Sequence, residues 1–109
     1  MAQEVSRGEI WLYRFAPPDK RRPVLVLSRP ELLPLLRTAT VAAISRSSHG
    51  APSEVALGID EGLKEPSWVN LAHVLTIPQG ELKRYVGTVG TDKMRDVCRA
   101  LALATGCDG

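Results

Sequence analysis

Cysteine is scarce in this chain, and no group of residues has the pattern of a metal site. The 109 residues include two cysteines, Cys98 and Cys107, which lie nine positions apart and form no CxxC motif. This spacing suggests neither a disulfide framework nor a zinc site, and no convincing cluster of Asp, Glu, His and Cys offers ligands to another metal. We therefore expect reduced structural thiols and a function that needs no metal and no cofactor.

Long apolar runs, internal repeats and low-complexity stretches are also absent. No run approaches the length of a membrane span, and Met1–Arg7 contains no apolar region typical of a signal peptide. These absences favour a cytoplasmic protein. A length of 109 residues with 44% hydrophobic residues fits a single domain over residues 1–109. A domain this small gains stability by burying more surface in an oligomer.

The positive charge is concentrated in one half of the sequence. The formal net charge is only +2, but the segment from Arg14 to Arg46 carries seven basic residues against two acidic ones. From Val55 onward, six basic residues are set against seven acidic ones. The basic half is either a surface that attracts an anionic polymer or a solvated face of the protein, and charge alone does not distinguish the two.

Short apolar runs separated by turn signals predict a mainly β protein. The run Pro23–Ser28 is continuously apolar and indicates a buried strand. Pro34 limits Glu31–Arg37 to a helical turn or two, and Pro17-Pro18-Asp19 predicts a turn after the first strand. The strands are expected at Glu9–Phe15, Pro23–Ser28, Thr38–Ser45, Glu54–Leu57, Ser67–Ile77 and Tyr85–Val89.

The C-terminal segment changes to the period of a helix. Thr91 is a candidate N-cap, Asp92 lies in the first turn, where the helix dipole favours an anion, and Gly106 supplies the stop. Five or six short strands followed by one helix predict a small, strongly bent β-barrel that the helix closes or flanks. The apolar face of the helix is expected to contain Met94, Val97, Cys98, Leu101 and Thr105.

Five motifs, in order along the chain, resemble those of the MazF/PemK/Kid family of toxins. They are RGEIW at residues 7–11, RPVLVLS at 22–28, AAIS at 42–45, the stretch Ser67–Ile77 and the ending Gly87–Gly106. Each motif alone is weak, whereas five in the right order across nearly the whole chain are specific. The resemblance implies an SH3-like β-barrel of five to seven strands with a C-terminal helix. It also implies a homodimeric endoribonuclease toxin that a cognate MazE-like antitoxin holds silent.

The resemblance further implies a catalytic pair. The family's catalytic arginine falls on Arg22 and its catalytic threonine on Ser45, which keeps the hydroxyl group. The segment between the first two strands is shorter than in the family, and Ala72 and Leu75 stand where an acid and an arginine are common, so RNA specificity and antitoxin contacts are expected to differ. The residues that we expect to contact RNA are Lys20, Arg21, Arg46, Ser47, Ser67 and His73.

RNA supplies its own nucleophile, because the 2′-OH can attack the adjacent phosphate, expel the 5′-oxygen and leave a 2′,3′-cyclic phosphate. The protein then has to align the strand, stabilise the phosphorane and move two protons. Guanidinium binds phosphate through two charge-assisted hydrogen bonds. Deprotonating an arginine whose pKa exceeds about 12 costs roughly 7 kcal/mol at pH 7. We therefore interpret Arg22 as the phosphorane clamp and Ser45 as a hydrogen-bond donor or relay, with the general base left open.

Simpler interpretations stay open for several of these residues. A serine at a strand end, such as Ser45, often caps a backbone group. His49 is either an exposed loop residue or a titratable participant in the reaction, and His73 is either a contact to a base or a packed structural residue. Trp11 and Trp68 either stack on bases or fill the core of a small barrel.

Two other function classes compete with the nuclease. A CcdB-like toxin would poison a protein target such as DNA gyrase through the end of its C-terminal helix. In this chain residues 104–109 carry no Trp or other large anchor. A catalytically idle barrel would bind RNA and leave it whole. Incubating the purified protein with RNA in EDTA distinguishes the idle barrel from the nuclease.

Overall fold

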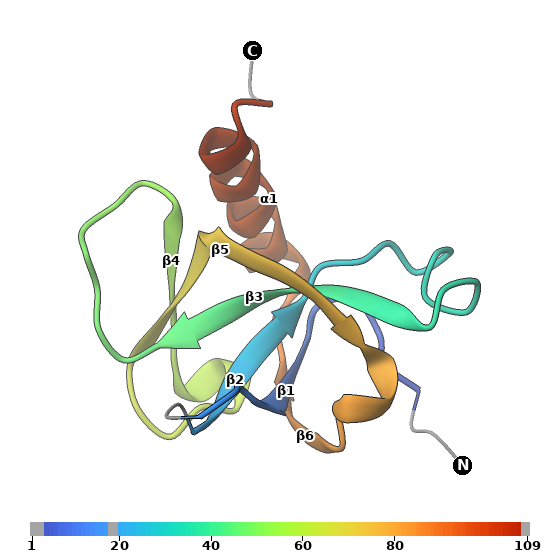
Figure 1. Cartoon of the computed structure of the whole chain (residues 1–109). Coiled ribbons are helices and arrows are strands. Elements are labelled where there is room, and N and C mark those ends of the chain that lie inside the picture. Colours follow the sequence, from blue (N-terminus) through green and yellow to red (C-terminus); the bar gives the residue numbers. More distant parts are fainter. Residues whose placement is uncertain (1–3, 18–19, 108–109) are drawn as a thin grey trace.

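A six-stranded antiparallel sheet with one α-helix packed against it forms the protein (Figure 1). The computed structural model describes residues 4–17 and 20–107. In this part of the chain, no helix is both long enough and apolar enough to cross a membrane. The elements are β1 (Glu9–Arg14), β2 (Arg21–Val26), β3 (Thr38–Ser45), β4 (Glu54–Leu57), a 3-10 turn at Ile59–Glu61, β5 (Ser67–Pro78), a second 3-10 turn at Gln79–Glu81, β6 (Arg84–Thr88) and α1 (Thr91–Thr105).

The strands are ordered β4-β5-β3-β2-β1-β6 across the sheet, which curls into a half-barrel (Figure 1). Register irregularities between Ile10 and Trp11, and between Ala42 and Ile44, interrupt two of the ladders. Such irregularities bend a strand and increase its twist. The expected fold class, a mainly β protein of five to seven strands with a C-terminal helix, is confirmed.

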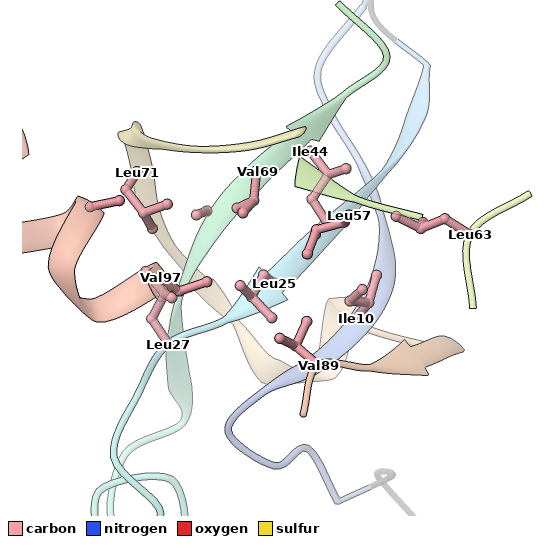
Figure 2. Packing of buried hydrophobic residues seen from close by; sticks show 12 residues of the cluster. Ile10, Leu25, Leu27, Ile44, Leu57, Leu63, Val69, Leu71, Val89 and Val97 are labelled. Carbon is pink, nitrogen blue, oxygen red and sulfur yellow. The ribbon is translucent and has the colours of Figure 1, made fainter. Parts of the chain in front are cut away.

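The sheet is apolar on both faces, so the protein has two cores. Figure 2 shows the first core, in which Leu25 and Ile44 face Val97 of helix α1. The second core lies on the opposite face and contains Val24 and Val26. Because neighbouring side chains of a strand point to opposite faces, a strand buried on both faces is continuously apolar. This explains the run of apolar residues in β2.

Helix α1 packs against β5 and β4 and differs in two details from the sequence prediction. Its N-cap is Gly90, so the prediction of Thr91 as the N-cap is wrong, and no side chain makes a capping hydrogen bond. Cys98 and Thr105 are exposed, because the buried stripe of the helix centres on Val97 and Ala100. The predicted stop is confirmed, since Gly106 adopts the left-handed conformation with φ of 75°.

The start of strand β2 and the turn before it bear on the site. Strand β2 begins at Arg21 rather than at the predicted Pro23, because β1 pairs with it as far as Arg14 opposite Arg21. Arg22 is therefore a strand residue, paired with Tyr13. Of the predicted turn Pro17-Pro18-Asp19, residues 18 and 19 lie outside the described part of the chain.

One glycine fixes the connection that follows β4. A Cβ atom added at Gly87 in β6 would lie 1.9 Å from the backbone oxygen of Glu61. Only a glycine allows this approach. The buried Glu61 carboxylate accepts a hydrogen bond from the Gly58 N–H at 2.6 Å and lies 3.4 Å from the Lys93 ammonium, so this connection is anchored at several points.

We expect Gly87→Ala to destabilise the fold by about 1–3 kcal/mol, because the new methyl group overlaps backbone that cannot move aside cheaply. Gly80→Ala is the matched control, since a Cβ at Gly80 meets nothing within 4 Å. Denaturant unfolding measures both variants. Equal stability of the two would contradict the close contact between Gly87 and Glu61.

Candidate functional site

The pairing of β2 with β3 brings Arg22 and Ser45 together at one end of the sheet. Val24 pairs with Ala43 and Leu25 with Ala42. The same antiparallel register, continued toward the strand ends, places Arg22 opposite Ser45. Residues directly opposite each other in two strands project from the same face of the sheet. Consistent with this arrangement, both residues line the same two neighbouring pockets.

The larger of these pockets, here called the basic pocket, has a volume of about 620 Å³. It gathers seven of the eight residues that the sequence predicted for the site. Lys64 also lines it, although no signal in the sequence pointed to that residue. Cations dominate its wall, so its field suits a phosphate-bearing ligand. The predicted residues in the basic pocket are Lys20, Arg21, Arg22, Ser45, Arg46, Ser47 and Ser67.

Glu65 provides partners for two of these residues, Arg46 and Ser67. The Arg46 guanidinium forms an ion pair with Glu65, and both side chains are largely exposed, so the pair contributes little to stability. Ser67 is buried, and its hydroxyl donates a hydrogen bond to the Glu65 carbonyl oxygen at 3.0 Å. This bond fixes the start of β5 beside the pocket.

The second pocket, here called the histidine pocket, has a volume of about 250 Å³ and contains both histidines of the chain. His49 comes from the loop after β3 and His73 from β5. The His73 ring lies 6.5 Å from the Phe15 ring, centroid to centroid. Arg22, Ser45 and Ser47 line this pocket as well as the basic pocket. The two pockets therefore share a wall that contains the predicted catalytic pair.

The two tryptophans have separate positions. Trp11 is buried in the second core and packs edge-to-face against Tyr85, with ring centroids 5.8 Å apart, so it fills the core. Trp68 is half-buried and lines the histidine pocket. Sequence alone did not separate these two positions.

Ser45 caps a backbone group and keeps a proton to donate. Its Oγ accepts a hydrogen bond from the Ser47 N–H at 3.0 Å. A hydroxyl has two lone pairs and one hydrogen, so accepting this bond leaves the O–H available for a ligand in the pocket. Capping and ligand contact are therefore compatible at this residue.

Glu54 holds the loop that carries His49. Its carboxylate accepts hydrogen bonds from the His49 N–H at 3.0 and 3.1 Å, from the Ser48 hydroxyl at 3.0 Å and from the Ala51 N–H at 3.2 Å. These bonds, the one from the His49 backbone above all, lower the pKa of Glu54. The loop from Arg46 to Ser53 is thus tied to the first residue of β4.

Among residues 4–17 and 20–107, no three His, Cys, Asp or Glu side chains are grouped so that they could hold a metal ion. The charged and polar groups at the site are guanidinium, ammonium, hydroxyl, imidazole and carboxylate. These groups can bind phosphate, donate hydrogen bonds and transfer protons.

Comparison with known proteins identifies relatives along almost the whole chain. A family model described as PemK-like, MazF-like toxin of type II toxin-antitoxin system matches residues 6–105. "Probable endoribonuclease MazF5" of Mycobacterium tuberculosis is 38% identical over 104 residues, which are 94% of this chain and 94% of that protein. The solved structure of Mycobacterium tuberculosis toxin MazF-mt6 matches with a TM-score of 0.84 at 32% identity and covers 93% of this chain and 99% of that one.

The fold and the relatives together define the class of protein: an endoribonuclease toxin of a type II toxin-antitoxin system. Within that class, the chain belongs to the PemK/MazF toxin family. A MazE-MazF structure from Deinococcus radiodurans, with a TM-score of 0.79, 20% identity and coverage of 95% of this chain and 97% of that one, shares the fold.

We expect Glu54→Gln to lower the melting temperature at neutral pH, because the amide holds the loop hydrogen bonds less strongly than a carboxylate does. The pKa of Glu54 is lowered in the folded state, so its stabilising contribution is present above glutamate's ordinary pKa of about 4.3. This contribution is lost as the pH falls through the lowered pKa of Glu54. The melting temperatures of the wild type and of the variant should therefore converge at acid pH. A difference that grows on acidification would contradict the prediction.

Proposed function

We propose that this toxin cleaves single-stranded RNA at the wall shared by the basic and histidine pockets, with Arg22 and Ser45 as the catalytic pair. The observation that carries the proposal is the β2–β3 register, which sets a guanidinium opposite a hydroxyl in an open, cationic pocket. The reaction is metal-independent attack of a 2′-OH on the adjacent phosphate. Its products are a 2′,3′-cyclic phosphate and a 5′-OH, and its effect is to inhibit translation and growth.

Arg22 stabilises the charge that develops on the phosphorane. A guanidinium offers two parallel N–H donors to phosphate oxygens and stays charged throughout the reaction. The Ser45 hydroxyl donates a further hydrogen bond to the same phosphate, since the Ser47 N–H occupies only one of its lone pairs. Both groups are held on strands, which keeps them aligned before the substrate arrives.

A proton has to leave the 2′-OH, and another has to reach the 5′-oxygen. Arginine is a poor acceptor, whereas imidazole has an ordinary pKa of about 6.5, close to the working pH. We infer that one of the two residues His49 and His73 accepts the 2′-OH proton. Their presence in the pocket that shares its wall with the basic pocket supports this role.

The proposed partners are a second copy of the chain and a cognate antitoxin. Leu35 is 76% exposed and Leu36 50% exposed. The Gln79 side-chain amide donates hydrogen bonds to the carbonyl oxygens of Leu33, Leu36 and Thr38 at 2.8–2.9 Å, so these leucines are presented on a fixed segment. Fixed, exposed leucines support a homodimer contact. The protein is proposed to act in the cytoplasm.

The antitoxin proposal is supported by two related proteins and by the charge of the site. An endoribonuclease from Mycobacterial species, with a TM-score of 0.85, was solved in complex with its cognate antitoxin, and the toxin from Deinococcus radiodurans was solved as MazE-MazF. The basic pocket of this chain offers a cationic surface to an acidic segment of such a partner.

We expect Arg22→Ala and Ser45→Ala each to reduce the cleavage of RNA in EDTA by about 10²–10³-fold, because each removes a group that stabilises transition-state charge. Ser45→Thr, which keeps the hydroxyl, should retain activity. Arg37→Ala removes a cation outside both pockets and serves as the charge control. Circular dichroism checks the fold. Full toxicity of folded Arg22→Ala protein would overturn the assignment.

Replacing the ribose on the 5′ side of the cut by deoxyribose should abolish cleavage, because no 2′-OH remains to attack the phosphate. Product mapping by gel and mass spectrometry reads the outcome, with the all-ribose oligonucleotide as the control. Cleavage of the substituted strand at the same bond would contradict attack by the 2′-OH.

Removing the accepting histidine should lower kcat and abolish the acidic limb of the pH profile of kcat/KM, which reports an imidazole that must be neutral. His49→Gln and His73→Gln are the two variants, and each serves as the control for the other. If both keep the wild-type rate and pH profile, neither histidine is the base.

A further inference from the structure

A second groove continues from the basic pocket along the neighbouring strands. This groove, here called the arginine groove, has a volume of about 450 Å³ and lies where β1, β2 and the start of β6 meet. Arg21 lines both the groove and the basic pocket, so the two are contiguous. The groove is lined by Leu12, Tyr13, Arg14, Arg21, Gly80, Glu81, Lys83 and Arg84, four cations against one carboxylate.

The sheet register crowds the cations of this groove onto one face. Arg14 pairs directly with Arg21, and Leu12, two residues before Arg14 on the same strand, pairs with Arg84. Residues two apart on a strand share a face, and so do directly opposed residues. The three guanidinium groups therefore project from the same side of the sheet. Like charges placed directly opposite in a sheet destabilise it.

Within the described part of the chain, none of the four cations of the groove forms an ion pair. The ion pairs between described residues are Arg46 with Glu65, Lys93 with Glu61, Arg95 with Asp92 and Arg99 with Asp96. Glu81, the carboxylate in the groove, faces the Tyr13 hydroxyl. Burial is the main cause that raises the pKa of Tyr13, and the neighbouring Glu81 carboxylate raises it further. On helix α1, by contrast, Arg95 and Arg99 are paired with Asp92 and Asp96.

We propose that the arginine groove binds phosphates of the RNA strand beyond the cut site. The proposal rests on the function proposed above. An endonuclease cuts within a strand, so the strand must continue past Arg22 and Ser45 on both sides of the scissile phosphate. The groove begins at Arg21, next to that pair, and presents three guanidinium forks and one ammonium group to a polyanion. Arg21 and Arg22 are neighbours on β2 and point to opposite faces of the sheet, so the RNA strand would reach the groove from the basic pocket past Arg21, round this end of the sheet.

The groove also gives a reason for the like-charge pair at Arg14 and Arg21. Residues selected for function are often unfavourable for stability. Phosphates bound between the two strands would neutralise the repulsion. Loss of these cations should therefore weaken RNA binding without weakening the fold.

The test uses the Lys83→Ala/Arg84→Ala variant and an uncleavable RNA that carries deoxyribose on the 5′ side of the mapped cut. The control, Arg95→Ala/Arg99→Ala, removes the same charge from helix α1, where both arginines are paired. Binding is measured against salt concentration for a long oligonucleotide and for one trimmed to the nucleotides that flank the cut. Melting curves at low salt monitor the fold.

We expect the Lys83→Ala/Arg84→Ala variant to bind the long RNA about tenfold more weakly and to lose about 1.4 from the slope of log K against log salt, or about 0.7 for each phosphate contact. Affinity for the trimmed RNA should stay within about twofold, and the melting temperature should not fall. On cleavable long RNA, KM should rise while kcat is retained.

Three results would overturn the proposal that the arginine groove binds RNA. They are a salt slope equal to that of the control, an equal loss of affinity for long and trimmed RNA, and unchanged RNA binding with a weakened antitoxin complex. The last would assign the groove to an acidic protein partner. Because binding is read on uncleavable RNA, these results are independent of catalysis. Failure of the proposed nuclease function would instead appear as wild-type protein that leaves cleavable RNA intact in EDTA.

Discussion

The antiparallel register between β2 and β3 is the constraint on which the site depends. A slip of one residue would turn every side chain of a strand to the other face of the sheet. Val24, Leu25 and Val26 are all fully buried and serve two different cores, so such a slip would unpack both cores at once. The same register, continued toward the strand ends, sets Arg22 opposite Ser45. The position of the proposed catalytic pair is therefore stabilised by hydrophobic packing several residues away.

Burial changes abruptly along β2, from two exposed arginines at its start to three fully buried residues at its end. Strand pairing supplies rigidity to the arginines, and both side chains are exposed at the rim of the basic pocket. The cost is a local excess of positive charge, since Arg14 of β1, Arg84 of β6 and Lys83 just before β6 lie at the same end of the sheet. A fold optimised for stability alone would alternate these charges with acids. The excess charge is better explained by binding to a polyanion.

Sequence patterns predicted what local chemistry determines and missed what strand pairing brings together. The bounds of β3 and β4 match the prediction, because turn-forming residues flank both strands. Strand β2 was predicted two residues too far along the chain, at Pro23–Ser28 instead of Arg21–Val26, since arginines at a strand end look like a loop until the partner strand is known. Lys64, Glu54 and Asn70 reach the pockets only through the connection after β4 and the pairing of β4 with β5.

In the proposed reaction, the two pockets supply different groups to RNA cleavage. A phosphorane needs fixed positive charge, and the basic pocket is lined by groups that stay charged at neutral pH. Proton transfer needs a group that changes its charge near neutral pH, and both imidazoles of the chain line the histidine pocket. Placing Arg22 and Ser45 in a shared wall lets one phosphate contact both environments.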